Sequence, residues 1–219
     1  MINYIRYISY LFVLIGFSIA NAGTYADFFD AVRRDDDRTI RVLLTRGFDP
    51  NTLAPNGEPG LILAVRESSF KAIAALLESP ATNVELRTSK DESALMLASL
   101  MGYFDICKNL IAHDADVNKT GWTPLHYAAT GGHLKIVQLL LDSHAYIDSA
   151  SPNGSTPLMM ASMYGTVDTV RMLLAAGADP SIKNDLGLTA IDFAMQVQRD
   201  DAVAAIAAAT RARRKSGSW

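Results

Sequence analysis

Few residues in this 219-residue chain are of types that carry out chemistry. The single cysteine, Cys107, could act as a nucleophile, but it cannot form a disulfide within the chain or build a cysteine-rich zinc site. Three adjacent acids at 35–37 could bind calcium, yet they lack the alternating ligand spacing of a calcium loop and are expected in a solvated turn. Four histidines stand apart, without metal-ligand spacing: His113, His126, His133 and His144.

Sequence motifs and charge exclude several further classes of protein. The chain has no phosphate-binding glycine loop, no nucleophile elbow and no His-Glu-x-x-His motif. We therefore expect no catalytic residue, no metal, no cofactor and no enzymatic activity. With 20 basic and 23 acidic residues the net charge is −3, which disfavours nucleic acid as a partner. A composition of 49% hydrophobic and 20% charged residues is typical of a folded chain.

The first 22 residues are typical of a secretory signal peptide. One basic residue, Arg6, precedes an uncharged apolar run at 11–20 and a small-x-small site, Ala20-Asn21-Ala22. The run is shorter than the roughly 20 residues that span a bilayer. We expect cleavage after Ala22, export to a bacterial periplasm or full secretion, and no stable membrane insertion afterwards. A retained anchor and a cytosolic product are the alternatives.

One short motif recurs along the rest of the chain. The helices that this repeat predicts determine where the other side chains lie. The sequence Thr-Pro-Leu-His-Tyr-Ala-Ala at 123–129 returns as Thr-Pro-Leu-Met-Met-Ala-Ser at 156–162, with weaker copies elsewhere. The central apolar residues of the copies are spaced by 33, 34, 30, 33 and 33 residues: Phe28, Leu61, Leu95, Leu125, Leu158 and Ile191. This near-constant period predicts six stacked units.

Each unit predicts two short helices with defined ends. Thr123 and Thr156 suit an N-cap, and the prolines that follow them suit the first helical position. The glycine pair 131–132 ends the first helix, and the apolar residues of 136–141 form one side of a second. Just past the second helix stand residues that tolerate a left-handed backbone: Gly47, Asp114, His144 and Gly177.

The period and the Thr-Pro-Leu-His motif resemble the ankyrin repeat, most strongly at 121–147 and 154–180. The resemblance implies an all-α solenoid of about six helix-turn-helix units, linked by short β-hairpin or turn fingers. It also implies that His126 and His133 form hydrogen bonds that tie one unit to the next. Cys107 takes the place of Val137 and Val170 in later units, so we expect it to be buried and unreactive.

The positions of the repeats divide the chain into five segments. Residues 1–22 are the signal peptide, 23–51 an N-terminal capping repeat and 52–180 four internal repeats. Residues 181–210 form a C-terminal capping repeat, and 211–219 a basic tail that we expect to be a frayed, solvated end, with a docking tail as the alternative. The link at 119–122 is three residues short, which predicts a truncated finger and a notch.

The ankyrin resemblance also indicates where a partner would bind. In that family the variable contacts come from finger tips and from the exposed end of each first helix. The matching residues here are Arg66, Glu92, Leu100, Met101, Trp122, Met163, Tyr164 and Leu188. From the third unit onward they form an apolar and aromatic stripe, which is typical of an interaction surface. For Met101 and Met163 the alternative is gap-filling between units.

These patterns predict a non-enzymatic, exported, monomeric module that binds one protein partner on its concave face. Two alternatives remain open at this stage. The same stripe could pair two copies of the chain in a structural or assembly role. The chain could also be a secreted factor that acts on a host cell.

Overall fold

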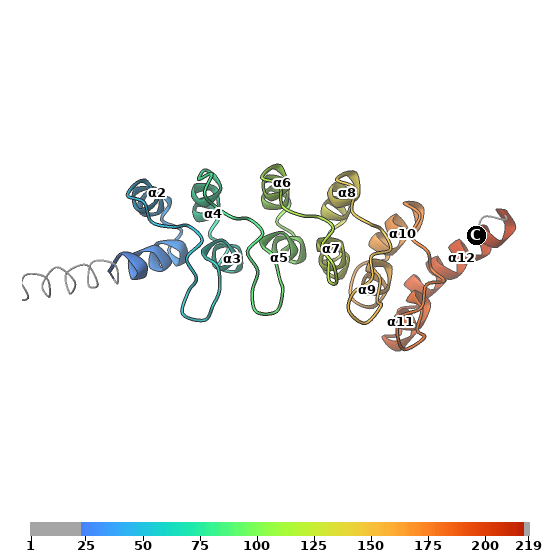
Figure 1. Ribbon diagram of the computed structural model, residues 1–219. Helices are drawn as coiled ribbons and strands as arrows, with labels where there is room; N and C mark the ends of the chain where they lie inside the picture. Colours follow the sequence, from blue (N-terminus) through green and yellow to red (C-terminus); the bar gives the residue numbers. More distant parts are fainter. Residues whose placement is uncertain (1–22, 217–219) are drawn as a thin grey trace, which may run out of the picture. The chain divides into compact units, whose positions relative to one another are not determined.

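The computed structural model describes residues 23–216, so the expected signal peptide lies outside the described residues (Figure 1). The chain divides into two compact units, one ending at Asp91 and one beginning at Glu92. No described helix is long and apolar enough to cross a membrane.

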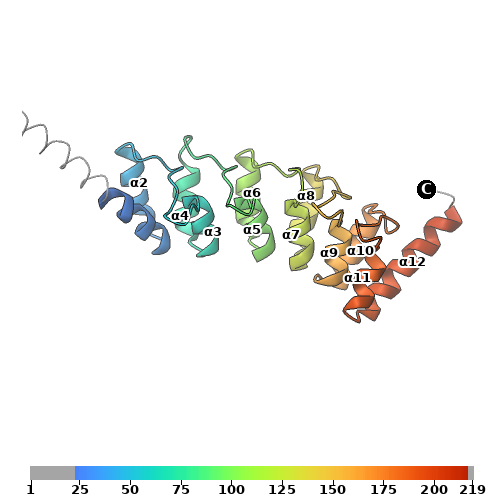
Figure 2. The same ribbon diagram turned by 60° about the horizontal axis from the view of Figure 1, so that its bottom comes forward.

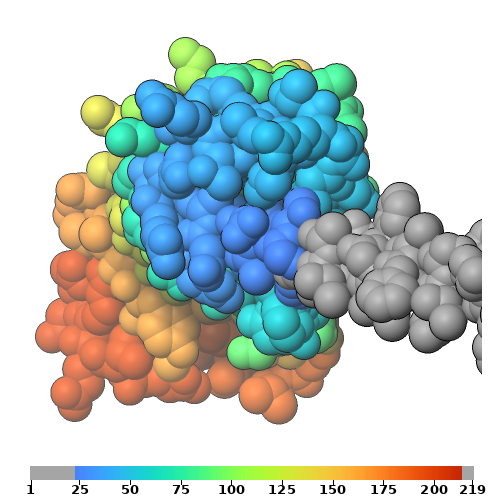
Figure 3. Space-filling view, turned by 90° about the vertical axis from the view of Figure 1, so that its left-hand side faces the viewer, coloured from blue at the N-terminus to red at the C-terminus, as the bar shows by residue number. Residues whose placement is uncertain are grey.

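The first unit contains four helical segments. They are residues 23–33, α2 (Asp37–Thr45), α3 (Gly60–Arg66) and α4 (Phe70–Leu77), and α4 packs against both α2 and α3. Phe28 is fully buried, and a Cβ atom at Gly60 would lie 2.8 Å from its ring, so α3 packs directly on it. Arg41 of α2 donates to both carboxylate oxygens of Glu78, at 2.8 and 2.9 Å. Figure 3 looks onto the outer end of this unit, in blue.

The second unit is built from two layers of helices (Figures 1 and 2). The inner layer consists of the first helix of each repeat: α5 (Ala94–Met101), α7 (Pro124–Gly131), α9 (Pro157–Met163) and α11 (Ala190–Gln196). The outer layer consists of the second helices: α6 (Phe104–Ala112), α8 (Leu134–Asp142), α10 (Val167–Ala175) and α12 (Asp200–Ser216). Fully buried leucines form the core: Leu110, Leu125, Leu140, Leu158 and Leu173.

The helix ends confirm the local predictions. The Thr123 and Thr156 hydroxyls each accept from a backbone N–H at 3.4 Å and cap α7 and α9, and a proline follows each cap. Gly132 ends α7 with φ of 70°. The residues expected past the second helices all have positive φ: Gly47 (90°), Asp114 (63°), His144 (64°) and Gly177 (109°). The sequence therefore places most helix boundaries correctly.

The fingers take the turn form of the prediction, without regular strands among the described residues. Isolated bridge residues occur in two of the fingers: Leu53 pairs with Pro59, and Arg87 and Ser93 are also bridge residues. At 151–155 the N–H of Ser151 bonds to the carbonyl of Ser155 at 2.9 Å, and the N–H of Gly154 bonds to the carbonyl of Ser151 at 2.8 Å. Gly121 turns the truncated finger at φ of 80°.

Histidine side chains join neighbouring repeats of the second unit, as predicted. His126 is fully buried, and its Nε2 lies 2.9 Å from the carbonyl of Ser155 in the next finger. Its Nδ1 accepts from the N–H of Thr123 at 3.2 Å, which leaves Nε2 as the donor. His133 Nε2 lies 2.9 Å from the carbonyl of Leu100 in the preceding repeat. Burial lowers the pKa of His126 to about 4, so this imidazole is neutral at physiological pH.

The C-terminal helix differs from the frayed end that we expected. α12 continues through the basic segment to Ser216. Arg213 donates to the carbonyl of Gly177 at 2.8 Å and lies 3.6 Å from Asp179. A basic side chain that reaches the preceding repeat keeps this end of the helix in place.

We predict that His126 makes stability depend on pH. Its pKa lies near 4 in the folded state and near 6.5 in the unfolded chain. As pH falls from 6.5 to 4, His126 becomes protonated in the unfolded chain but stays neutral in the folded state. The free energy of unfolding therefore falls. Between pH 7.5 and pH 5 this contribution is about 2 kcal/mol.

The matched variant is His126→Met, because methionine occupies the same place in the flanking repeats. Met96 and Met159 accept there from the N–H groups of Ser93 and Thr156, both at 3.4 Å. Urea unfolding at the two pH values should show about 2 kcal/mol less acid destabilisation in the variant. Equal pH dependence in the two proteins would contradict the buried, neutral state of His126.

Consecutive inner helices approach so closely that one position accepts only glycine. A Cβ atom at Gly165 would lie 2.3 Å from the carbonyl oxygen of Ala129 and 3.0 Å from the Cα of Ala161. Both neighbours are backbone atoms, so neither can rotate away. The constraint at this position is therefore steric.

We predict that Gly165→Ala lowers the free energy of unfolding by about 1–3 kcal/mol, the usual cost of overpacking. The control is Gly187→Asn, since Gly187 has φ of 76° and open space where a Cβ would stand. Asparagine tolerates that backbone conformation, so this change should cost much less. Urea denaturation measures both. An equal loss in the two variants would refute the close approach of α7 and α9.

Candidate protein-binding surface

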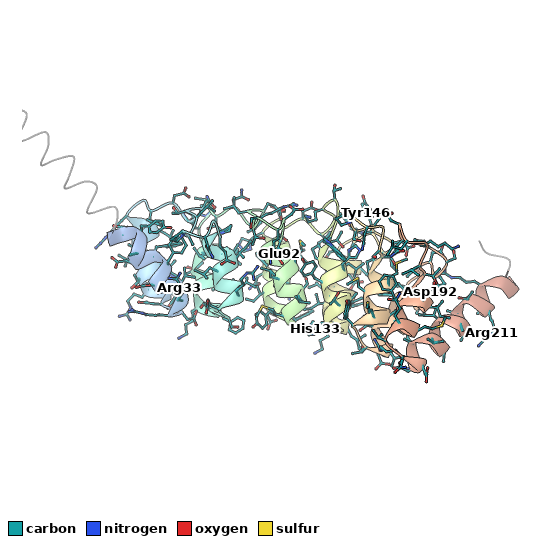
Figure 4. All side chains as sticks on the ribbon, turned by 90° about the horizontal axis from the view of Figure 1, so that it is seen from below. Arg33, Glu92, His133, Tyr146, Asp192 and Arg211 are labelled. Carbon is teal, nitrogen blue, oxygen red and sulfur yellow. The ribbon has the colours of Figure 1, made fainter. Side chains whose placement is uncertain are left out.

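The exposed residues of the predicted stripe lie at the ends of two inner helices. Leu100 and Met101 close α5, with 37% and 38% of their surface exposed, and Tyr164 follows α9 with 58% exposed. Met163, beside Tyr164, is half-buried. In Figure 4 the inner layer faces the viewer, with Glu92 and His133 marking opposite ends of its helices. We call the solvent side of α5, α7, α9 and α11 the inner face.

Side chains of the following repeat form hydrogen bonds to the backbone at the C-terminal ends of α5 and α9. His133 bonds to the carbonyl of Leu100, in the last turn of α5. Arg199 Nη1 donates to the carbonyls of Ala161, Ser162 and Gly165 at 3.0, 3.3 and 2.6 Å, and so caps the end of α9. These hydrogen bonds thus fix the helix ends that carry Met101 and Tyr164 in the absence of a bound partner.

Trp122, which we predict as a partner-binding residue, is less exposed than Tyr164. It is half-buried, and its ring meets the His126 imidazole edge to face, with the centroids 5.3 Å apart. This contact covers the buried histidine at the start of α7. Trp122 therefore borders the inner face.

Of the other predicted residues, two precede an inner helix and one belongs to the first unit. Leu188 is half-buried, and its backbone N–H donates to Oδ1 of Asn184 at 2.9 Å. Glu92 is half-buried at the opposite end of α5. Arg66 belongs to the first unit, is exposed, and pairs with Glu58 at 2.6 Å. Leu100 and Met101 thus lie at the end of α5 and Met163 and Tyr164 at the end of α9, whereas Glu92 and Leu188 precede the first helices of their repeats.

Sequence reasoning missed two apolar residues on α11. Val197, 38% exposed, holds in the sixth repeat the place of Met101 and Tyr164, eight residues after the helix N-cap. Met195, 52% exposed, holds the place of Ala129, which faces the next repeat in an internal unit. Continuing the repeat register to the sixth copy would have found both. Tyr146, at 68%, is also exposed but lies in the loop after α8 (Figure 4).

Charge is divided unequally between the two layers of the second unit. Helices α5, α7 and α9 contain no Asp, Glu, Lys or Arg, and α11 contains one, Asp192, whose carboxylate accepts from the N–H and hydroxyl of Thr189 at 2.8 and 2.6 Å. Every outer helix carries both acidic and basic residues. Six of the chain's eight methionines lie on α5, α9 and α11. The inner face is therefore apolar and almost free of charge.

The residues singled out for chemistry have structural roles. Cys107 is fully buried, with its Sγ 3.7 Å from the hydroxyl of Ser99, and burial raises its thiol pKa to about 11. It is therefore protonated and inaccessible at neutral pH, as expected. Asp35 accepts from the N–H of Ala72 at 2.9 Å, and Asp36 caps α2. In the part of the chain that the structure describes, no three acidic, histidine or cysteine side chains gather as metal ligands.

Comparison with known proteins agrees with this architecture. A family model described as ankyrin repeats (3 copies) matches residues 28–120, 81–151, 102–184 and 144–213. The crystal structure of an ankyrin repeat domain from Acinetobacter baumannii aligns with a TM-score of 0.74 and 25% identity, covering 84% of this chain and 97% of that one.

Curated relatives are larger proteins that contain similar repeats. The chain is 34% identical over 142 residues to the ankyrin repeat and SAM domain-containing protein 6 of Mus musculus, covering 62% of this chain and 16% of that protein. It is 32% identical over 161 residues to the nuclear factor NF-kappa-B p105 subunit of Gallus gallus, covering 70% and 16%. It spans about a third or less of the relatives' length. Since the family model matches residues 28–213, the chain belongs to the ankyrin repeat family, whose repeats are protein–protein interaction modules.

Proposed function

We propose that this chain is an exported, non-enzymatic ankyrin protein that binds a protein partner on the inner face of its second unit. The observation that carries the proposal is the combination of exposed Leu100, Met101 and Tyr164 with an almost charge-free inner layer. Interface cores are depleted in charged residues and enriched in methionine and aromatic residues. A face with this composition suits burial against another protein.

The anchoring of the helix ends supports the same function. Binding costs less free energy when the contacting groups are already ordered. Bonds from His133 and Arg199 fix the last turns of α5 and α9, so Met101 and Tyr164 stand on rigid backbone. Tyr164 is the main anchor, because it is the exposed aromatic residue of this face. Trp122, Glu92 and Leu188 form the border of the proposed surface.

The proposed export rests on the first 22 residues, which carry a short apolar run before Ala20-Asn21-Ala22. The periplasm is the proposed location. Here too the prediction can be checked directly: intact-mass analysis of the chain made in a secreting host should give an N-terminus of Gly23-Thr24-Tyr25. A mature protein that retains Met1 would contradict cleavage.

Truncating the anchors should weaken binding of the partner. Loss of a central interface side chain typically costs about 2 kcal/mol or more, which is more than tenfold in affinity. We therefore expect a Met101→Ala/Tyr164→Ala double variant to bind the protein captured by the natural chain at least tenfold more weakly. Affinity capture from a periplasmic or secreted extract, followed by titration with the captured protein, measures this.

The matched control is Tyr146→Ala, because Tyr146 is even more exposed but lies off the inner face. This variant should bind as tightly as the natural chain. Urea unfolding of all three proteins checks that folding is preserved. Equal retention by the double variant, or equal loss with Tyr146→Ala, would refute the assignment of the site.

A further inference from the structure

We propose that the group bound on the inner face is the apolar side of a single α-helix of the partner. This inference rests on the proposed function and specifies the class of ligand. Three observations support it: the modes of peptide recognition that the face permits, the spacing of its helices and its lack of charge.

Three common modes of recognition do not fit this face. Strand addition needs an open sheet edge, and no described residue of the second unit belongs to a strand. Proline-rich segments dock between several aromatic side chains, but Trp122 packs on His126 and Tyr164 is the exposed aromatic of the inner face. Phosphorylated or acidic motifs need an arginine cluster, and helices α5, α7, α9 and α11 carry no Lys or Arg.

The spacing of the exposed side chains matches one helix. Neighbouring helices pack with their axes about 8–10 Å apart, so α5 and α9, on either side of α7, lie roughly 16–20 Å apart. A helix with its side chains is about 10–12 Å wide. A single helix lying over α7 therefore reaches Met101 on one side and Tyr164 on the other. α7 itself ends in Gly131, which adds no side chain between them.

The charge pattern defines the surface of that helix. A charged group pressed against the inner face would lose its hydration without gaining a partner, which is costly. The bound helix must therefore present apolar residues at i, i+3 or i+4 and i+7, and carry its charges on the opposite side. Methionine side chains adapt to different apolar shapes, so Met101 and Met163 can accept more than one sequence.

Two synthetic peptides of identical composition test this inference. Both contain leucine, alanine and lysine over about 18 residues, or five helical turns. In one the leucines follow the helical period, and in the other they alternate with polar residues. Fluorescence anisotropy of the labelled peptides with the full chain, in about 1 M salt to screen charge attraction, measures affinity.

We expect the helical peptide to bind at least tenfold more tightly than the alternating one. The Met101→Ala/Tyr164→Ala variant should lose at least tenfold in affinity for it, and Tyr146→Ala should not. Equal binding of the two peptides, or no binding of either, would overturn the helix inference. A concentration-dependent dimer in sedimentation that the double variant abolishes would also overturn it, because a second copy would then cover the face.

The failure of this inference can be distinguished from failure of the proposed function. If a captured partner depends on Met101 and Tyr164 while the helical peptide does not bind, the function stands and the helix class is wrong. If neither partner nor peptide depends on these residues, the binding surface itself is wrong.

Discussion

The close approach of consecutive inner helices is the constraint on which the second unit depends. The backbone of Gly165 lies so near the carbonyl of Ala129 that no Cβ atom fits between them. Small residues make this possible, because Ala128 and Ala129 of α7 and Ala161 of α9 leave the backbones free to meet. Larger side chains here would push the repeats apart and place the carbonyls of one repeat beyond reach of the next.

The hydrogen bonds between repeats follow from that approach. In the middle of the unit His126 and His133 bridge to backbone carbonyls of adjacent repeats. In the last repeat Arg199 stands where His133 stands in the fourth, and its longer side chain reaches three carbonyls of the preceding repeat instead of one. A second arginine, Arg213, bonds to Gly177 from the extended α12. The sixth repeat is thus bonded to the fifth through guanidinium groups.

The sequence predicted the fold well because its signals are local and repeated. N-cap threonines, helix-starting prolines and the left-handed positions each report a backbone conformation that few residues adopt, and a 33-residue period repeats them. The candidate surface was harder to predict, since exposure depends on contacts between repeats. Trp122 aligns with a polar surface position, but its ring covers His126. Arg199 and Val197 were missed because the sixth copy of the motif is weak. The length of α12 was missed because basic residues at its end suggested a free tail rather than contacts with Gly177 and Asp179.

The charge division between the layers shows that packing alone does not determine the inner face. An inner helix contacts a neighbour on each side and an outer helix behind it, which leaves one side open to water. Nothing in the stack requires that side to be apolar, and in the first unit α3 ends in Arg66, followed by Glu67. In α5 and α9 the same places hold Leu100, Met101, Met163 and Tyr164. Charged residues at these helix ends would be better hydrated, and the fold permits them. The apolar residues found there are best explained by contact with another molecule.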